Sequence, residues 1–432
     1  MRLFSNENII ERKGSFYIFV QILNSLFMEF SMRKIIIIST LLLITSNIFA
    51  QKADQMIGVT AGQLALGGSV VADPIDAPSM LYNPAAIGVL EFNKIGFDVS
   101  LGFVNPPREI KSAIGTPLEK NTESNSNYYL GMGNGFAAKI TDKIIVGVAA
   151  GGVSGMGVDF PSSTLVDNPT TPFPENVSVV SKKGLLKIVP TIAYKINNDL
   201  TIAASIQIAQ QSLSLKTPAF ILPQTENYGF GGSFGLIYKA LPNLQLGLSY
   251  TSEINISEYE FNGTSLHPMA GGDGVYLFDM DSPQNVAFGI AFKPMSKLQV
   301  EADLKWYNFS SVLDKIDLTT PSGLVIPVNF GWEDQMVYSI GAKLNANECM
   351  TIMAGYSYGA TPITEENVGN NLGSIAVVEH HISIGLKRAW NVNLSSTISF
   401  THGLHNELES SVAPLNIAAS QNIVFFQFGY RM

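Results

Sequence analysis

The sequence contains little cysteine and few charges. Cys349 is the only cysteine among 432 residues, so neither an intramolecular disulfide nor a thiolate metal cluster can form. Only 14% of the residues are charged, well below the roughly 25% that is usual in soluble proteins. The formal net charge is -9, and no run of lysines and arginines stands out. This composition argues against a cysteine-stapled scaffold and against nucleic acid as a partner.

Long apolar runs are scarce as well. One region near the N-terminus approaches the apolar length of a membrane helix, which excludes a polytopic helical membrane protein. From Met32 this region reads Met-Arg-Lys, continues with apolar residues over 35–44 and ends on small residues up to Ala50, which predicts a cleavable signal peptide over residues 32–50. A membrane anchor is the alternative, although the run is short of the ~20 residues that an anchor needs. We therefore expect residues 1–31 to be an extension in front of the true start.

Alternation of apolar and polar residues dominates the chain after residue 50. In the segment 298–306 the even-numbered residues are apolar and the odd-numbered ones are polar or charged. Segments 201–208 and 392–400 repeat this period of two, which is typical of β-strands with one apolar face. The whole chain then gives about fourteen strands, over 95–103, 128–139, 144–160, 185–196, 200–215, 228–239, 244–261, 285–292, 298–310, 335–344, 350–358, 379–388, 392–403 and 422–430.

The connections between these strands alternate between tight turns and long loops. Tight turns are expected at 141–143, 197–199, 240–243, 293–297, 345–349 and 389–391. Short turns facing the periplasm and long loops facing the exterior are typical of outer-membrane barrels. In lipid every backbone N–H and C=O must be satisfied internally, so a chain without spanning helices crosses only as a closed barrel. The predicted fold class is all-β, a transmembrane antiparallel β-barrel of about 14 strands over residues 94–432, in the outer membrane of a Gram-negative bacterium.

The same register places charged side chains inside the barrel. Glu301, Asp303 and Lys305 face the lumen, together with Lys195 and Lys343, while the apolar set faces lipid. Charges are tolerated there because the interior can be wet or paired. These residues either form a hydrogen-bonded ladder that fills the barrel or contact a transported compound.

Residues 51–93 precede the first expected strand and are rich in small residues. They do not have the composition of barrel wall. Two interpretations fit: a disordered periplasmic leader, or a plug folded into the lumen, because wide barrels need something to stop leakage.

At this point the sequence resembles a known family. The run 67–90, with Asp73 and the triplet Asn83-Pro84-Ala85, resembles the hatch of the FadL family of outer-membrane fatty-acid and hydrocarbon transporters. The likeness covers nearly the whole chain after residue 50, because further stretches follow the family's order and spacing. These stretches are 185–200, 228–254, 298–311, 334–362 and the triplet Thr401-His402-Gly403.

The resemblance implies passive transport of hydrophobic compounds, with long-chain fatty acids as the leading class, through a 14-stranded barrel that holds a hatch. A ligand would be captured at the extracellular loops, enter a pocket in the barrel and leave sideways through a gap at a kinked third strand. The matching stretch is 151–160, with Gly155 and Gly157 at the kink, where glycine permits a bulge and leaves no side chain to fill an opening. The residues that the resemblance assigns to the hatch and its gating are Asp73, Asn83, Pro84 and Ala85.

Two features depart from the family pattern. The loop over 216–227 is short, so whether a ligand is captured at the surface is an open question. The chain also ends on Met432 where phenylalanine is usual. Some relatives are barrels of a secretion apparatus. That role, a channel for aromatic or alkane hydrocarbons and a general aqueous porin are the alternatives to fatty-acid transport.

Catalytic and metal-binding patterns do not stand out. His380 and His381 are adjacent, so on a strand they point to opposite faces and cannot hold one metal together. A nucleophile elbow, HExxH or a P-loop does not occur. We therefore expect no enzyme activity, no cofactor and no metal. The expected partners are hydrophobic small molecules, outer-membrane lipid and lipopolysaccharide, and the barrel-assembly machinery, with the protein acting as a monomer.

Overall fold

The computed structural model describes residues 53–162, 164–165, 178–217, 219–265 and 272–432. The expected extension over residues 1–31 and the expected signal peptide over 32–50 lie outside these residues. Within the described ranges, no helix is both long enough and apolar enough to cross a membrane.

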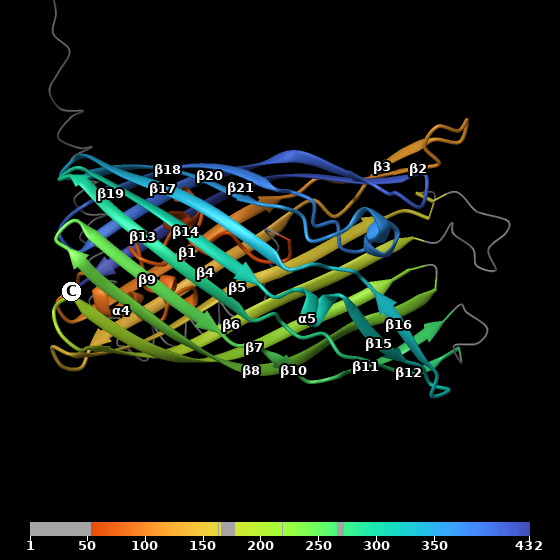
Figure 1. Cartoon of the computed structure of the whole chain (residues 1–432), viewed down its shortest axis with the longest axis horizontal. Coiled ribbons are helices and arrows are strands. Elements are labelled where there is room, and N and C mark those ends of the chain that lie inside the picture. Colours follow the sequence, from red (N-terminus) through yellow and green to blue (C-terminus); the bar gives the residue numbers. More distant parts are fainter. Residues whose placement is uncertain (1–52, 163, 166–177, 218, 266–271) are drawn as a thin grey trace, which may run out of the picture. The chain divides into compact units, whose positions relative to one another are not determined.

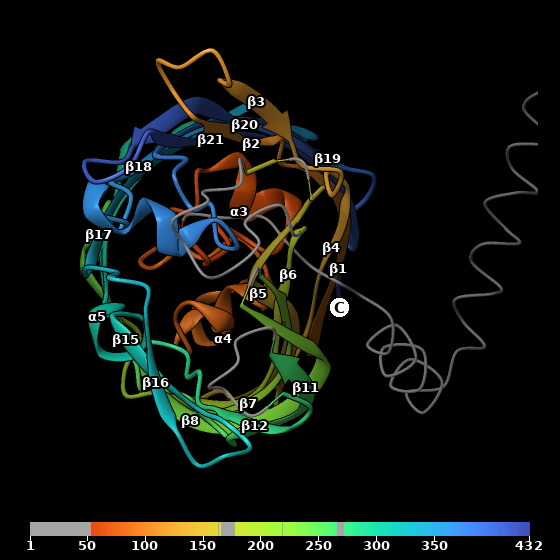
Figure 2. The same ribbon diagram turned by 90° about the vertical axis from the view of Figure 1, so that its right-hand side faces the viewer.

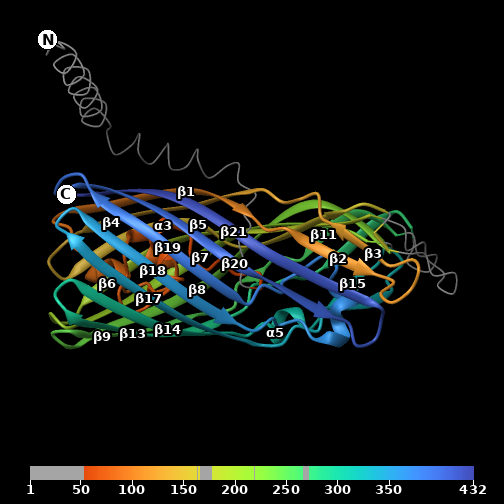
Figure 3. The same cartoon turned by 90° about the horizontal axis from the view of Figure 1, so that it is seen from above.

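Fourteen long antiparallel strands close into a barrel (Figures 1 and 3). Each strand pairs with the next one in the wall, and the last strand, β21, pairs with the first, β1, so the ladder is continuous around the circle. The wall strands are β1 (Ile95–Asn105), β4 (Tyr129–Lys139), β5 (Ile144–Phe160), β6 (Val179–Lys195), β7 (Leu200–Lys216), β8 (Phe220–Leu241), β9 (Leu244–Thr251), β13 (Asn285–Met295), β14 (Leu298–Tyr307), β17 (Gln335–Asn347), β18 (Met350–Gly359), β19 (His380–Ala389), β20 (Leu394–Glu409) and β21 (Leu415–Arg431). The predicted fold class is confirmed.

The alternation along the strands separates the two faces of the wall. In β7 the odd-numbered residues Thr201, Ser205 and Gln207 are buried in the lumen, whereas Ile206 is 59% exposed on the outside. Apolar side chains cover the outer face because it lies against hydrocarbon, and polar ones find hydrogen-bond partners inside. The predicted direction of the register is therefore right.

Several wall segments differ from the prediction. β6 begins at Val179 and not at 185, β20 ends at Glu409 and not at 403, and β21 begins at Leu415 and not at 422. β8 begins at Phe220 and not at 228, so it extends beyond its expected start on the long-loop side. The segment 244–261 is not one strand, because β9 ends at Thr251. There the Ser252 hydroxyl accepts a hydrogen bond from the Gly232 backbone N–H (2.9 Å) and donates one to the Glu253 carbonyl (2.9 Å), and the regular ladder is interrupted until Asn255 pairs with β8 again.

The long loops carry structure of their own at one end of the barrel (Figure 1). Strand β11 pairs with β12, β12 with β15 and β15 with β16, which makes a small second sheet from the segments that follow β9 and β14. The bounds of the loop elements are β2 (Arg108–Ser112), β3 (Lys120–Glu123), β10 (Asn255–Ile256), β11 (Tyr259–Ser265), β12 (Gly274–Phe278), β15 (Lys315–Thr319), β16 (Val325–Asn329), α5 (Ser310–Leu313) and η3 (Glu365–Asn371).

Residues 53–93 fold inside the ring of strands, and we call them the hatch (Figure 2). The hatch contains α3 (Ala61–Ala65), η1 (Ala77–Leu81) and α4 (Ala86–Val89). The Thr60 hydroxyl caps α3 and the Asp76 carboxylate caps η1, because each accepts a hydrogen bond from a backbone N–H in the first turn. Nearly all of its residues are buried. Of the two interpretations of this segment, a periplasmic leader and a plug in the lumen, the plug is the one that agrees with where it lies.

Candidate functional site

The charged residues of β14 hold the hatch by its backbone. Glu301 Oε1 accepts hydrogen bonds from the N–H groups of Ala72 (2.7 Å) and Asp73 (3.0 Å). Asp303 Oδ2 accepts from the next two N–H groups toward the N-terminus, those of Val71 (3.2 Å) and Val70 (2.9 Å). Two neighbouring carboxylates of one strand therefore bind four successive amides of the hatch, and hydrogen bonds to a charged acceptor are the strong kind.

Lys305 completes this contact on the same strand. Its ammonium donates to the Gly68 carbonyl (2.5 Å), lies 3.5 Å from Asp303 Oδ2 and sits 5.3 Å from the centre of the Tyr82 ring. Burial raises the pKa of the Tyr82 phenol well above its usual value, so the hydroxyl remains a neutral donor toward the Met56 carbonyl. We call Glu301, Asp303 and Lys305 the β14 latch.

Asp73 contacts a different strand of the wall. Its carboxylate forms an ion pair with Lys343 of β17, and the carbonyl of the preceding Ala72 accepts a hydrogen bond from the Gln245 side chain of β9. The segment 70–73 is thus held from three wall strands, the neighbours β14 and β17 and, beyond β13, the strand β9.

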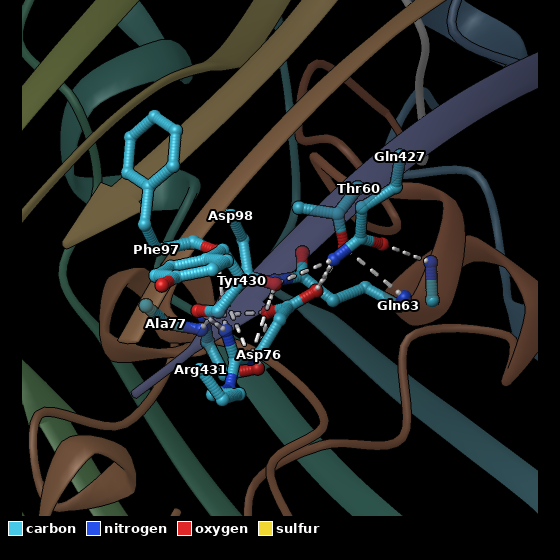
Figure 4. Close-up of polar contacts among 11 residues, drawn as sticks. Thr60, Gln63, Asp76, Ala77, Phe97, Asp98, Gln427, Tyr430 and Arg431 are labelled. Atoms are coloured by element: carbon cyan, nitrogen blue, oxygen red, sulfur yellow. Dashed lines mark hydrogen bonds and ion pairs between the residues drawn. The ribbon is translucent and has the colours of Figure 1, made fainter. Parts of the chain in front are cut away.

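A second polar cluster fixes the hatch to the opposite part of the circle, where the ladder closes (Figure 4). The Asp76 carboxylate accepts hydrogen bonds from Gln63 Nε2 (2.8 Å) and from Gln427 Nε2 of β21 (3.0 Å). Asp98 of β1 accepts from the Ala77 N–H (2.8 Å) and forms an ion pair with Arg431 (2.8 Å). Because β1 and β21 are the first and last wall strands, these side chains join the hatch to the closing seam of the barrel.

Asn83 ties the end of the hatch to β8. Its Nδ2 donates to the carbonyls of Val71 (2.7 Å) and Leu236 (3.3 Å), and its Oδ1 accepts from the Ala85 N–H (3.0 Å). A Cβ on Gly235 would lie 2.0 Å from Asn83 Oδ1 and 2.8 Å from the Pro84 ring, so this wall position has room only for glycine. The triplet 83–85 therefore packs directly against the wall.

The third wall strand, β5, leaves the regular wall in its second half. Its ladder with β4 ends at the pair Gly133 and Gly151, although β4 continues to Tyr129 on its other side. All residues over 149–158 are buried, so alternation between lumen and lipid is lost. The register with β6 shifts between Gly152 and Ser154, which places the bulge just before Gly155 and Gly157. We call this region the β4–β5 gap.

The first residues of the hatch lie along the free edge of β5 in this gap. Gln55 forms a bridge with Ser154, the Met56 N–H donates to the Val153 carbonyl (2.8 Å), and the Gly155 N–H donates to the Asp54 carbonyl (3.0 Å). Hatch backbone thus takes the place that a wall strand would occupy.

Two lysines of β6 face the lumen beside this segment. Lys183 forms an ion pair with Asp54 at 2.7 Å, and both side chains are almost fully buried. Lys187 is also buried (6% exposed) and lies opposite Gly151, the last residue of β5 that pairs with β4. Within the part of the chain that the structure describes, no carboxylate forms an ion pair with Lys187.

Aromatic side chains fill the barrel toward the long loops. Tyr259 stacks on Phe261 with ring centres 5.3 Å apart, and Phe309 meets Trp332 edge to face at 5.2 Å. All four are fully buried. The loop between β7 and β8 spans only residues 217–219, so it is even shorter than predicted.

Sequence reasoning found part of this site. The structure places Glu301, Asp303 and Lys305 against the hatch, whose backbone they bond. Asp54, Lys183 and Lys187 were not singled out. A signal existed for the lysines, because they occupy inward positions of β6 between apolar residues, but the sequence does not show what faces them.

The comparisons with known proteins agree with this architecture. The family model "Outer membrane protein transport protein (OMPP1/FadL/TodX)" matches residues 50–372. No curated protein matches the chain. The crystal structure of the P. putida toluene transporter TodX is similar with a TM-score of 0.72 and 18% identity, over 87% of this chain and 99% of that chain.

Two further structures share the fold. A Pseudomonas aeruginosa FadL homologue gives a TM-score of 0.71 at 12% identity, over 88% of this chain and 99% of that chain. The Ralstonia pickettii toluene transporter TbuX gives 0.67 at 19% identity, over 87% and 98%. The family model covers the whole hatch and most of the wall. The chain belongs to the OMPP1/FadL/TodX family of outer-membrane transport proteins.

Proposed function

We propose that the protein carries hydrophobic compounds passively across the outer membrane and releases them sideways through the β4–β5 gap. The observation that carries this proposal is the inward course of residues 149–158 of β5, where wall pairing is replaced by the first residues of the hatch. In lipid, an unpaired strand edge is unfavourable. A segment that covers such an edge from inside, and that is not itself part of the wall, is suited to act as a removable seal.

The hatch contacts fit the role of a gate. The bonds over the gap come from a short segment, residues 54–56, whereas the β14 latch and the Asp76 cluster hold the rest of the hatch over many contacts. Movement of residues 54–56 alone would uncover the gap without unseating the hatch. Asp73, Asn83, Pro84 and Ala85 then keep the hatch in place, and Gly155 and Gly157 line the exit.

The energetics suit an apolar cargo. Each CH2 group removed from water is worth about 0.8 kcal/mol, so a long hydrocarbon chain favours the aromatic interior near the loops and then the bilayer over water. Each step is downhill, and the protein needs no energy source.

Among hydrophobic compounds, the buried Lys187 makes long-chain fatty acids the first candidate for the transported compound. It places a buried ammonium group beside the gap, and a buried charge is costly unless an opposite charge pairs with it. The carboxylate of a fatty acid supplies that charge, whereas toluene does not. Monoaromatic hydrocarbons are the second candidate, because the structures of similar fold include toluene transporters.

The test is uptake of labelled oleate and labelled toluene by cells that lack their own such transporters, with a small sugar as control. We expect oleate uptake to depend on the protein, and Lys187→Met to reduce it several-fold. Lys182→Met is the matched control, since Lys182 is on the same strand and faces the other side.

Three results would count against this proposal. Uptake of toluene alone would assign the protein to hydrocarbons, and uptake of the sugar would indicate an open porin. No uptake, together with co-purification of large partner proteins, would favour a secretion complex.

A further inference from the structure

A cavity of about 240 Å3 lies at the short-turn end of the barrel, which faces the periplasm, between the hatch and the wall. It is separate from the β4–β5 gap, because its wall residues come from β13, β14, β17, β18 and β19 and from the turn between β13 and β14. The hatch contributes Pro74 and Ile75. Four of the wall residues are lysines, namely Lys293, Lys297, Lys343 and Lys387.

The lining is strongly unbalanced in charge. None of the residues that line this cavity is acidic. Lys343 pairs with Asp73, which lies just outside the lining, but the other three lysines form no ion pair within the described ranges. Like charges around one space repel each other, and this repulsion is relieved when an anion enters.

The strand register points three of these lysines inward. Lys293 lies two residues after the buried Ala291, and Lys343 and Lys387 lie four residues after the buried Ser339 and Ser383, so each has the same parity as the inward residues of its strand. These three side chains come from alternate wall strands, β13, β17 and β19. Lys297 lies in the turn between β13 and β14, and it and Lys293 are exposed, so the cavity can be reached from the short-turn end.

We propose that this cavity binds a small oxyanion with more than one negative charge, of the phosphate or pyrophosphate type, that is dissolved in the periplasm. The volume admits such an anion, and lysine binds phosphate as a point charge. Gln299 and Thr351, which also line the cavity, add an amide and a hydroxyl donor. The site does not depend on which hydrophobic compound the barrel carries.

Asp73 is the internal competitor for this anion. It already pairs with Lys343, and its backbone N–H is held by Glu301. An anion in the cavity shares Lys343 with Asp73 and weakens the bond between the hatch and β17. Removing the Asp73 charge therefore strengthens anion binding.

The test is calorimetric titration of the purified protein in non-ionic detergent with inorganic pyrophosphate, at low and constant ionic strength. We expect saturable binding that weakens by about tenfold or more in Lys293→Gln/Lys297→Gln, where two charged contacts are lost. The matched control is Lys143→Gln, an exposed lysine in another tight turn that does not line the cavity. No saturable binding, or equal weakening by the control, would overturn the site.

A second variant works in the opposite direction, so a folding defect cannot imitate it. We expect Asp73→Asn to bind pyrophosphate several-fold more tightly, and unchanged or weaker binding would contradict the proposal. Nanodiscs separate the two sources of phosphate. If phosphatidylglycerol discs abolish pyrophosphate binding and phosphatidylcholine discs do not, a lipid head group holds the site and the free anion is wrong.

Discussion

Single polar side chains carry much of the connection between the hatch and the wall. Asn83 is an example, because one amide group satisfies two carbonyls and one N–H from three different parts of the chain. It is completely buried. Removing it would leave these buried backbone groups without their partner, which costs about 1–3 kcal/mol per group.

Asn83→Ala is therefore expected to loosen the hatch while leaving the barrel closed. Single-channel recordings in planar bilayers should show frequent brief openings that the unchanged protein lacks. Asn243→Ala, in an exposed turn at the wall, serves as the control. Equal recordings from both variants would mean that Asn83 does not hold the hatch.

The β5 strand combines two environments in one element. Its first half, up to Gly151, is ordinary wall, and its second half turns inward and pairs with the hatch. Four glycines over 151–157 permit this course, because glycine tolerates a bulge and close backbone contact. In the proposed function, release and sealing both depend on this element together with residues 54–56.

A reversible disulfide crosslink between β5 and the hatch tests whether the transported compound leaves through the β4–β5 gap. In a Cys349→Ser background, Gln55→Cys/Ser154→Cys places two cysteines at bridged positions of β5 and the hatch. We expect the oxidised protein to stop oleate uptake and a reductant to restore it. Uptake that continues while the crosslink is complete, as judged by electrophoretic mobility, would exclude exit through the gap.

At the scale of the whole molecule, the protein is an outer-membrane transport barrel and not an enzyme. The hatch fills the lumen on one side, and buried aromatic residues lie toward the loop end. Deleting residues 51–93 is expected to raise ion conductance in planar bilayers, because the wall alone leaves an open lumen. A deletion variant with proper barrel spectra and unchanged conductance would show that the loops seal the barrel without the hatch.

The wall could be predicted from the sequence because the face of a wall strand that lies against lipid must be apolar. β7 is an example, since it alternates regularly and its bounds, Leu200–Lys216, agree with the expected 200–215 to within one residue. The outer part of β8, residues 220–227, was missed because its first three residues are all apolar and its last four are all polar, so apolar and polar residues do not alternate there. Alternation reports the face of a residue only where the two sides differ in polarity.

The contacts of the hatch could not be predicted in the same way. Period-two analysis shows that Asp303 and Lys183 point inward, but it does not show which backbone or side chain they meet. Asp54 pairs with Lys183, 129 residues away, and Asp76 bonds Gln427, 351 residues away. Such pairs follow from closure of the barrel, and a single sequence shows no trace of that proximity.

The polar contacts between the hatch and the closing seam of the barrel bear on the order in which the parts of the molecule assemble. Gly62 and Asp76 bond Gln427 of β21, the last wall strand, and Ala77 bonds Asp98 of β1, the first. The hatch precedes every wall strand along the chain, yet this part of its binding surface exists only after the first and last strands have met. Contacts of such long sequence separation form slowly. We therefore expect the hatch to be fully seated only after the barrel has closed, and a newly closed barrel to leak ions until then.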